Sequence, residues 1–308
     1  MFYADEYLPR NIIVGKFGVP YLDKELLGIS KSDLVVIGAR SGAGKSSLAR
    51  IIYETNNPLT TALFSLENFD GDLLAEELRK AYNSRMKTFF TPREWQTGQI
   101  QFERQVLEEL EQEIVKQYQS DTIFGRKTPD NQPWTVETLK SEMMRCVTSL
   151  GVNLIILDHL DYLNRDNPNE SDISHITDLM NMIREVQENA PDGCGVVAFS
   201  HLRKPIGKVD DIKVPNENEF IGSSNKIKQA TQVVMIAPTN EPMEYRGFGT
   251  WFCIRKNRNG GIKNQAAKLY FNPMTATYDP QYDLYNINYS GTKTEPITEQ
   301  ECILDDKF

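Results

Sequence analysis

The sequence predicts an α/β fold in which a mostly parallel central sheet is flanked by helices. Strands that are buried on both faces read as short apolar runs without polar alternation. Such runs lie at 34–37, 154–157 and 196–199, with weaker ones at 61–64 and 233–236. Between two of the strong runs, residues 171–190 carry apolar side chains at helical spacing. Strands that alternate with helices predict a parallel sheet with right-handed crossovers.

Composition and charge exclude several classes of protein. The 34 basic and 43 acidic residues give a net charge of -9, which disfavours a protein that coats nucleic acid with its whole surface, so any such site must be local. No apolar run is long enough to cross a bilayer and the N-terminus lacks the layout of a secretion signal, so we expect a cytoplasmic protein with no membrane partner. The cysteines, which form no CxxC pair, are expected to pack in the core; they are Cys146, Cys194, Cys253 and Cys302.

The chain divides into one large domain and two short ends. We expect an N-terminal extension at 1–17, a nucleotide-binding domain at 18–290 and a polar, acidic tail at 291–308. Within the domain, the stretch from about 81 to 135 is rich in Gln, Glu, Lys and Arg and is predicted to be a helical excursion from the core. The stretch 203–219 has little periodicity and is predicted to be a long loop, a feature that is usually functional or disordered.

A phosphate-binding loop follows the first strand. The run GARSGAGKSS fits the P-loop pattern, with Ala39 where a glycine is usual, and a helix follows it. Backbone N–H groups at such a helix start bind phosphates, Lys45 is expected on the β- and γ-phosphates, and the Ser46 hydroxyl is expected on Mg²⁺. The alternative is a glycine-rich turn that contains a lysine by chance. The expected nucleotide-binding residues here are Ala39, Ser41, Gly42, Ala43, Gly44, Lys45, Ser46 and Ser47.

Three further polar residues follow apolar strands and are candidates to complete an ATP site. Asp158 is expected to bind Mg²⁺, or else to cap the next helix. Glu67 could orient the attacking water or be an ordinary helix-start carboxylate. His201 could contact a γ-phosphate or be a structural histidine. His159 and His175 have no comparable context, and no grouping of His, Cys and carboxylates in the sequence suggests a transition-metal site.

Five blocks in this order resemble the DnaB-type and phage helicase-primase-type family of replicative helicases, a branch of the RecA-like ATPases. They are GVPYLDKELLGISKSDLVVIGARSGAGKSS, ALFSLEN, VNLIILDHLDYL, VVAFSHLRKP and CIRKNRNGG. The resemblance implies a RecA-like core with Glu67 as catalytic base, Asp158 on Mg²⁺ and His201 on the γ-phosphate. It also implies that Lys256 and Arg258 enter the nucleotide site of a neighbouring subunit; without the other blocks, they would read as a solvated basic turn.

The resemblance implies further contacts with nucleotide and DNA. An aromatic of the closing strand pair, Phe271 or Tyr270, would pack near the adenine, although an aromatic in a strand is usually a core residue. A hexameric ring with ATP between subunits would move on single-stranded DNA by loops that line a channel; lysines there could also be ordinary solvated surface. The loop residues expected to contact DNA are Arg203, Lys204, Lys208, Lys213, Ser223, Asn225 and Lys226.

Two other functions share these motifs. A RecA-type recombinase or recombination mediator would form filaments, and a RecA-like ATPase switch would bind no nucleic acid. The ligands expected in each case are ATP, or another ribo- or deoxyribonucleoside triphosphate, and Mg²⁺. For a helicase we also expect contacts with a primase, a polymerase or a single-strand-binding protein. The 17 residues before the domain are too few for a primase domain or helical collar, and the phage-type blocks favour a phage or mobile element as the source.

Overall fold

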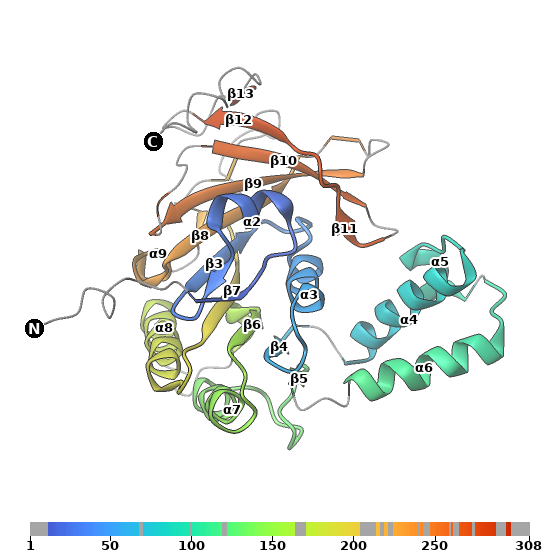
Figure 1. Cartoon of the computed structure of the whole chain (residues 1–308), viewed down its shortest axis with the longest axis horizontal. Helices are drawn as coiled ribbons and strands as arrows, with labels where there is room; N and C mark the ends of the chain where they lie inside the picture. Colours follow the sequence, from blue (N-terminus) through green and yellow to red (C-terminus); the bar gives the residue numbers. More distant parts are fainter. Residues whose placement is uncertain are drawn as a thin grey trace, which may run out of the picture.

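A computed structural model describes most of the chain and contains one large mixed sheet. The described residues are 12–67, 70–98, 100–118, 122–163, 171–203, 214–215, 219–220, 224–239, 241–242, 247–258, 260, 265–272, 275–287 and 294–296. The large sheet has the strand order β13-β12-β10-β9-β8-β3-β7-β6-β4-β5, with β11 paired to β10, and β1 and β2 form a separate small sheet (Figure 1).

The strands have the following bounds. They are β1 (Ile13–Gly15), β2 (Ile29–Ser30), β3 (Leu34–Ala39), β4 (Thr61–Ser65), β5 (Ile123–Phe124), β6 (Leu154–Asp158), β7 (Gly195–His201), β8 (Gln232–Pro238), β9 (Phe248–Asn257), β10 (Gln265–Asn272), β11 (Thr277–Tyr278), β12 (Asp283–Ile287) and β13 (Thr294–Pro296). All five apolar runs of the sequence lie in strands of the parallel part, β8-β3-β7-β6-β4-β5, so the predicted parallel sheet is confirmed. The remaining strands extend it by antiparallel pairing.

Helices cover both faces of the parallel strands. They are α2 (Pro20–Leu26), α3 (Lys45–Thr55), α4 (Asp70–Met86), α5 (Pro92–Thr97), α6 (Arg104–Tyr118), α7 (Val136–Ser149), α8 (Asp172–Asn189) and α9 (Ser224–Gln229), with a short 3-10 helix, η1 (Leu160–Tyr162). Leu34 and Val36 of β3 pack in one hydrophobic cluster with α7 and α8, whereas Val35 and Ile37 pack in a second cluster with α2 and α3. This alternation follows from the two-residue period of a strand and gives the three-layer architecture.

The predicted helix at 171–190 is confirmed as α8. Ser171 caps it, because the Ser171 hydroxyl accepts a hydrogen bond from the backbone N–H of Ser174 and satisfies one of the unpaired donors of the first turn. No helix of the described chain is long and apolar enough to span a bilayer.

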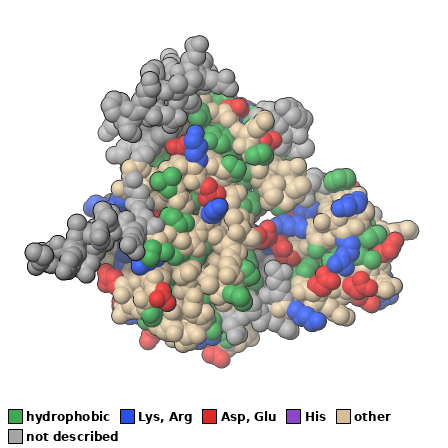
Figure 2. Space-filling view, viewed as in Figure 1, with side chains coloured by type: hydrophobic (Ala, Val, Ile, Leu, Met, Phe, Trp, Pro, Cys, Tyr) green, Lys and Arg blue, Asp and Glu red, His purple; other side chains and the backbone are tan. Residues whose placement is uncertain are grey.

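The helical excursion is larger than the sequence indicated and is interrupted by a strand. It begins with α4 at Asp70 rather than near Ala81, and α4, α5 and α6 project from the core (Figure 1). Tyr82 packs at its centre against three other aromatic rings, so this lobe has a small core of its own. After the lobe, β5 pairs with β4, so part of the predicted excursion belongs to the sheet. The lobe's surface carries acidic and basic side chains side by side (Figure 2).

The ends of the predicted long loop at 203–219 lie close together. The backbone N–H of Arg203 donates to the carbonyl of Glu219 at 2.7 Å, and Leu202 forms a β-bridge with Phe220. Most of the loop between these ends lies outside the described residues, as do the N-terminal residues 1–11 and the tail from 297 onward.

Candidate active site

The P-loop residues form an open cradle between β3 and α3. Gly42 and Gly44 have φ values of 77° and 78°, a left-handed conformation that glycine adopts without a steric penalty. A Cβ on Gly42 would have no atom within 4 Å, so it would project into the space that the loop encloses. A cavity of about 260 Å³ is lined by this loop together with Glu67 and His201. Its shape and exposed backbone amides suit a phosphate chain.

The polar residues that follow the strands converge on this cradle. Parallel pairing places Ala39 level with His201, and Ser65 level with Asp158, so these strand ends meet at one edge of the sheet. Ligands bind at this edge in open α/β sheets. The Lys45 ammonium donates a hydrogen bond to the Glu67 carboxylate at 2.9 Å, lies 3.4 Å from the His201 ring and is 3.8 Å from Asp158. The structure thus brings together the residues that the sequence predicted for catalysis.

The surroundings of these groups shift their pKa values. Burial raises the pKa of Asp158, and the charge of Lys45 and a hydrogen bond from Ser46 only partly oppose this effect. Burial would also raise the pKa of Glu67, but the hydrogen bond and charge of Lys45 lower it overall. Burial, together with the neighbouring charge of Lys45, lowers the pKa of His201, so the ring is neutral near pH 7.

The Asp158 carboxylate and the Ser46 hydroxyl fit an Mg²⁺ ion. The Oδ1 atom of Asp158 is buried and accepts no hydrogen bond from any described residue, which leaves a lone pair for a cation. Ser46 and Asp158 also line a shared cavity of about 260 Å³ beside the P-loop. Oxygen ligands of this kind suit Mg²⁺, which usually keeps several waters and binds through one or two protein groups and substrate phosphates.

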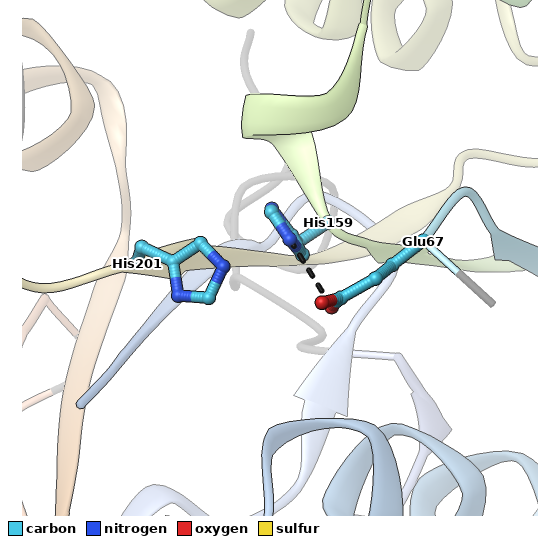
Figure 3. A group of neighbouring side chains, drawn as sticks. All are labelled: Glu67, His159 and His201. Atoms are coloured by element: carbon cyan, nitrogen blue, oxygen red, sulfur yellow. Dashed lines mark ion pairs between the residues drawn. The ribbon is translucent and has the colours of Figure 1, made fainter. Parts of the chain in front are cut away.

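His159 belongs to the site, contrary to the expectation from the sequence. Its ring is 1% exposed, its Nε2 lies 3.2 Å from the Glu67 carboxylate, and it packs edge-on against the His201 ring (Figure 3). Glu67, His159 and His201 thus form the His and carboxylate grouping that the sequence did not reveal. The Lys45 ammonium contacts two of its members, so positive charge already lies where a transition metal would bind. The missed signal was position, since His159 directly follows Asp158 at the strand end.

The residues predicted to contact DNA are placed very differently. Arg203 is exposed. Lys226 does not lie at a loop tip: it is fully buried in α9 and donates to Asp161 at 3.0 Å and to Ser200 at 2.7 Å, because only such partners allow a lysine to be buried. This placement corrects the expected surface role. The side chain of Asn225 in α9 is not described, and outside the described residues lie Lys204, Lys208, Lys213 and Ser223.

Comparisons with known proteins agree with this fold and site. The family model of the DnaB-like helicase C terminal domain matches residues 16–280. The chain belongs to this family. As a DnaB-like helicase, it is an ATP-hydrolysing DNA helicase of the replicative type.

Solved structures of DnaB-like helicases share the fold. One, the isolated ATPase domain of such a helicase, has a TM-score of 0.70 and 17% sequence identity, with 90% of this chain and 95% of that chain covered. Another, a DnaB-like replicative helicase whose structure was described with its interactions with primase, has a TM-score of 0.67 and 18% identity, with 89% of this chain and 65% of the other covered. No curated protein matches the chain by sequence.

In this DnaB-like domain, Lys256 and Arg258 lie at the sheet edge opposite the P-loop. The Arg258 N–H donates to Thr231, whose own N–H donates to Leu34 at the start of β3. The P-loop follows the other end of β3, five residues along the strand or roughly 16 Å away. The Lys256 ammonium donates to two carbonyls of α9, and Arg258, which is exposed, donates to one of them. Neither side chain reaches the chain's own phosphate cradle.

The aromatic residues of the closing strands lie beside the P-loop. Phe271 of β10 is half-buried, and its ring centroid is 5.2 Å from that of Tyr278 in β11. The Tyr278 hydroxyl would be 3.5 Å from a Cβ on Gly44. Tyr278, which the sequence analysis did not single out, therefore connects Phe271 to the cradle. The Tyr270 hydroxyl donates instead to Asp283, on β12.

Proposed function

We propose that this helicase works as a hexameric ring with each ATP between two subunits, and that ATP hydrolysis drives its movement along single-stranded DNA. The observation that carries this proposal is the separation of Arg258 from the P-loop of its own chain. An arginine that completes an ATP site must then act on a neighbouring subunit. Repetition of one head-to-tail interface gives a closed ring where the rotation suits.

The residues of one subunit would bind and orient the nucleotide. The P-loop amides and Lys45 hold the phosphates, Phe271 lies near the adenine, and Asp158 and Ser46 hold Mg²⁺. Mg²⁺ supplies positive charge that neutralises the phosphate oxygens. In the structure, the Lys45 ammonium is bonded to Glu67. When phosphates take over this ammonium, the Glu67 carboxylate becomes available to orient the attacking water.

The neighbouring subunit would supply Arg258, with Lys256 beside it, to the charge that develops on the γ-phosphate. His201 would report whether that phosphate is present, because its ring lies next to Lys45 and is neutral. Hydrolysis would then weaken one inter-subunit contact and shift loops that contact DNA. Those loops include Arg203, with the candidate lysines at 204, 208 and 213 and the polar residues at 223 and 225.

The partners and the source follow the same reasoning. We propose DNA rather than RNA as the strand, a cytoplasmic location, and docking to a primase, a polymerase or a single-strand-binding protein. The primase contact described for one structural relative is a property of that protein. A domain spanning residues 18–290, with short segments on either side, would be the unit that assembles.

Two measurements on one preparation test the proposal. The mass of the assembly with a non-hydrolysable ATP analogue should be that of a hexamer, and single-stranded DNA should stimulate hydrolysis several-fold. Long filaments in the same conditions would favour a recombinase. Hydrolysis that single-stranded DNA leaves unchanged would favour an ATPase switch that binds no nucleic acid.

A further inference from the structure

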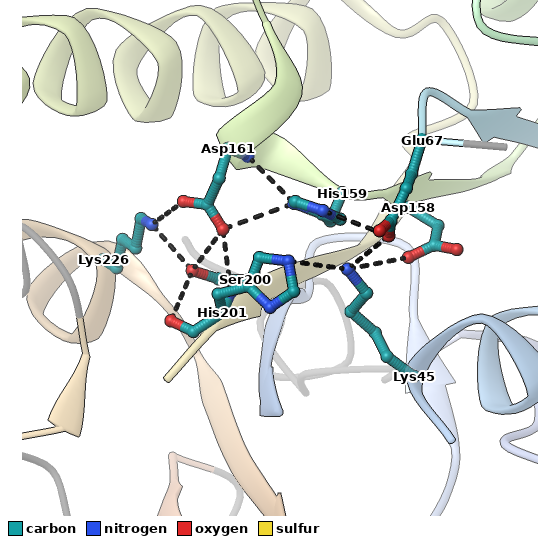
Figure 4. Close-up of polar contacts among 8 residues, drawn as sticks. All are labelled: Lys45, Glu67, Asp158, His159, Asp161, Ser200, His201 and Lys226. Atoms are coloured by element: carbon teal, nitrogen blue, oxygen red, sulfur yellow. Dashed lines mark hydrogen bonds and ion pairs between the residues drawn. The ribbon is translucent and has the colours of Figure 1, made fainter. Parts of the chain in front are cut away.

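A buried histidine lies between two carboxylates beside the P-loop. The Nε2 atom of His159 is 3.2 Å from the Glu67 carboxylate, and its Nδ1 atom is 3.3 Å from the Asp161 carboxylate (Figure 4). Its ring is held edge-on by Tyr162 on one side and His201 on the other, with centroid distances of 4.8 and 4.2 Å. The ring is therefore fixed in position by contacts on its edges and on both nitrogens.

Asp161 is itself held by three groups. It accepts hydrogen bonds from the backbone N–H of His201 at 2.7 Å and from the Lys226 ammonium at 3.0 Å, and the hydroxyl of Ser200 contacts both it and Lys226. Burial would raise the pKa of Asp161, but its contacts with His159, Lys226 and the His201 backbone hold this pKa well below its ordinary value. Asp161 is thus a charged anchor for the histidine ring.

The last member of this chain of contacts comes from a different part of the sequence. Lys226 lies in α9, just after the segment in which most of the candidate DNA-contacting residues occur. Its side chain is fully buried and crosses to the 3-10 helix that follows β6. A displacement of the start of α9 would therefore move the Lys226 ammonium and, through Asp161, the ring of His159.

We propose that His159 is a positioning residue that orients Glu67 for hydrolysis, and that Asp161 and Lys226 transmit the position of α9 to it. The coupling rests on the proposed action on single-stranded DNA. It assigns His159 a role that does not require contact with the nucleotide. It also gives Lys226 a role inside the protein in place of a contact with DNA.

The reason lies in the freedom of Glu67. This side chain is 31% exposed and follows the end of β4, so only its contacts with Lys45 and His159 fix its carboxylate. Once phosphates take over Lys45, His159 remains as the contact that holds the carboxylate. Misplacement of a catalytic group by about 1 Å can lower the rate on the order of a hundredfold. The P-loop does not depend on His159, so ATP binding should be retained.

The first test separates turnover from binding. His159→Asn should lower kcat by about 10- to 100-fold while the KM for ATP changes by less than about twofold. His175→Asn is the matched control, because His175 is also buried but lies on α8 away from the site, and it should keep wild-type kcat. A wild-type kcat in folded His159→Asn, or a KM that rises as steeply as kcat falls, would overturn the positioning role.

The second test concerns the connection to α9. Lys226→Met should reduce the stimulation of hydrolysis by oligo-dT to less than about twofold, while the affinity for fluorescent oligo-dT stays within about twofold of wild type because Lys226 is fully buried. Lys228→Met is the matched control: the residue lies on the same helix, its side chain is exposed, and the variant should retain wild-type stimulation.

A companion variant deals with folding. Lys226→Met alone leaves the Asp161 carboxylate buried without its lysine, so the double variant Lys226→Met with Asp161→Asn removes both charges. It should fold and show the same loss of stimulation. If wild type itself is not stimulated by oligo-dT, the proposed function fails. If wild type is stimulated and the folded Lys226 variants are stimulated equally, the proposed function stands and this inference is wrong.

Discussion

The Lys45 ammonium and the Glu67 carboxylate lie 2.9 Å apart, at the mouth of the P-loop cradle. This ion pair joins the residue expected to bind the phosphates to the residue expected to orient water. Because one ammonium cannot serve both groups fully, phosphate binding and the release of Glu67 are coupled. The site can therefore be held inactive until a nucleotide enters.

Lys45→Ala should abolish hydrolysis while the protein stays folded. Loss of the ammonium removes a preorganised charge from the transition state, which lowers kcat on the order of 10²- to 10³-fold. Lys45 is 8% exposed rather than freely exposed as the sequence suggested, and its loss leaves Asp158 without its cation, so the melting temperature should fall as well. Lys24→Ala, at a side chain that is 70% exposed, is the control. Full ATPase activity with Mg²⁺ in Lys45→Ala would contradict the assignment.

Arg258→Ala should leave ATP binding near normal and remove most hydrolysis, because an arginine finger acts chiefly on transition-state charge and its loss can lower the rate about a thousandfold or more. Arg104→Ala, at a side chain that is 90% exposed on α6, is the control.

The geometry between subunits can be tested by mixing. Arg258→Ala and Glu67→Ala subunits, each inactive alone, should recover hydrolysis when combined, since a mixed interface can contain one intact Glu67 and one intact Arg258. Recovery of no activity, in assemblies shown to contain both subunits, would place Arg258 outside the neighbouring site.

The buried thiols should be unreactive in the folded protein. Burial raises the pKa of Cys146, Cys194 and Cys253 to about 12, so almost no thiolate is present at pH 8. In a thiol assay at pH 8, at most one thiol, that of Cys302, should react before denaturant is added, and four should react afterward. Rapid reaction of two or more thiols in folded protein would contradict this burial.

The same thiols predict how stability changes with pH. In the unfolded chain, thiols ionise near pH 8.5, whereas the folded ones stay protonated up to about pH 12. The folded state therefore binds more protons between these values, and the free energy of unfolding should fall as pH rises through this window. Urea titrations at pH 7.5, 9 and 10.5 measure it. A constant free energy of unfolding across this range would show that the thiols contribute nothing.

Gly38→Ala should destabilise the fold. A Cβ on Gly38 would lie 2.6 Å from both the Leu202 and the Phe220 side chains, which are buried and flank the loop at 203–219. Overpacking of this kind destabilises a core by about 1–3 kcal/mol, measurable by urea denaturation. Phe220→Leu in the Gly38→Ala background should recover part of the loss by making room. A double variant no more stable than Gly38→Ala would point to a cause other than this contact.

The sequence predicted the sheet and most of the catalytic cluster because both depend on local patterns. Apolar runs mark strands buried on both faces, and polar residues that follow parallel strands must meet at one edge. Lys226 was misjudged because its partner, Asp161, lies 65 positions away in the sequence. Its position after a glycine and serine turn resembled a surface site. His159 was missed for a similar reason, since its role arises from contacts with Glu67 and Asp161 that no spacing reveals.

The most direct test of the central claim is strand separation on a forked DNA duplex. Wild-type protein with ATP and Mg²⁺ should separate a fork with single-stranded tails at a rate that depends on hydrolysis, and a mixture of Arg258→Ala and Glu67→Ala subunits should regain part of that activity. Neither variant alone should separate the strands. Strand separation at the wild-type rate by Arg258→Ala alone, or none by wild-type hexamers that hydrolyse ATP on single-stranded DNA, would contradict an ATP-driven ring with its sites between subunits.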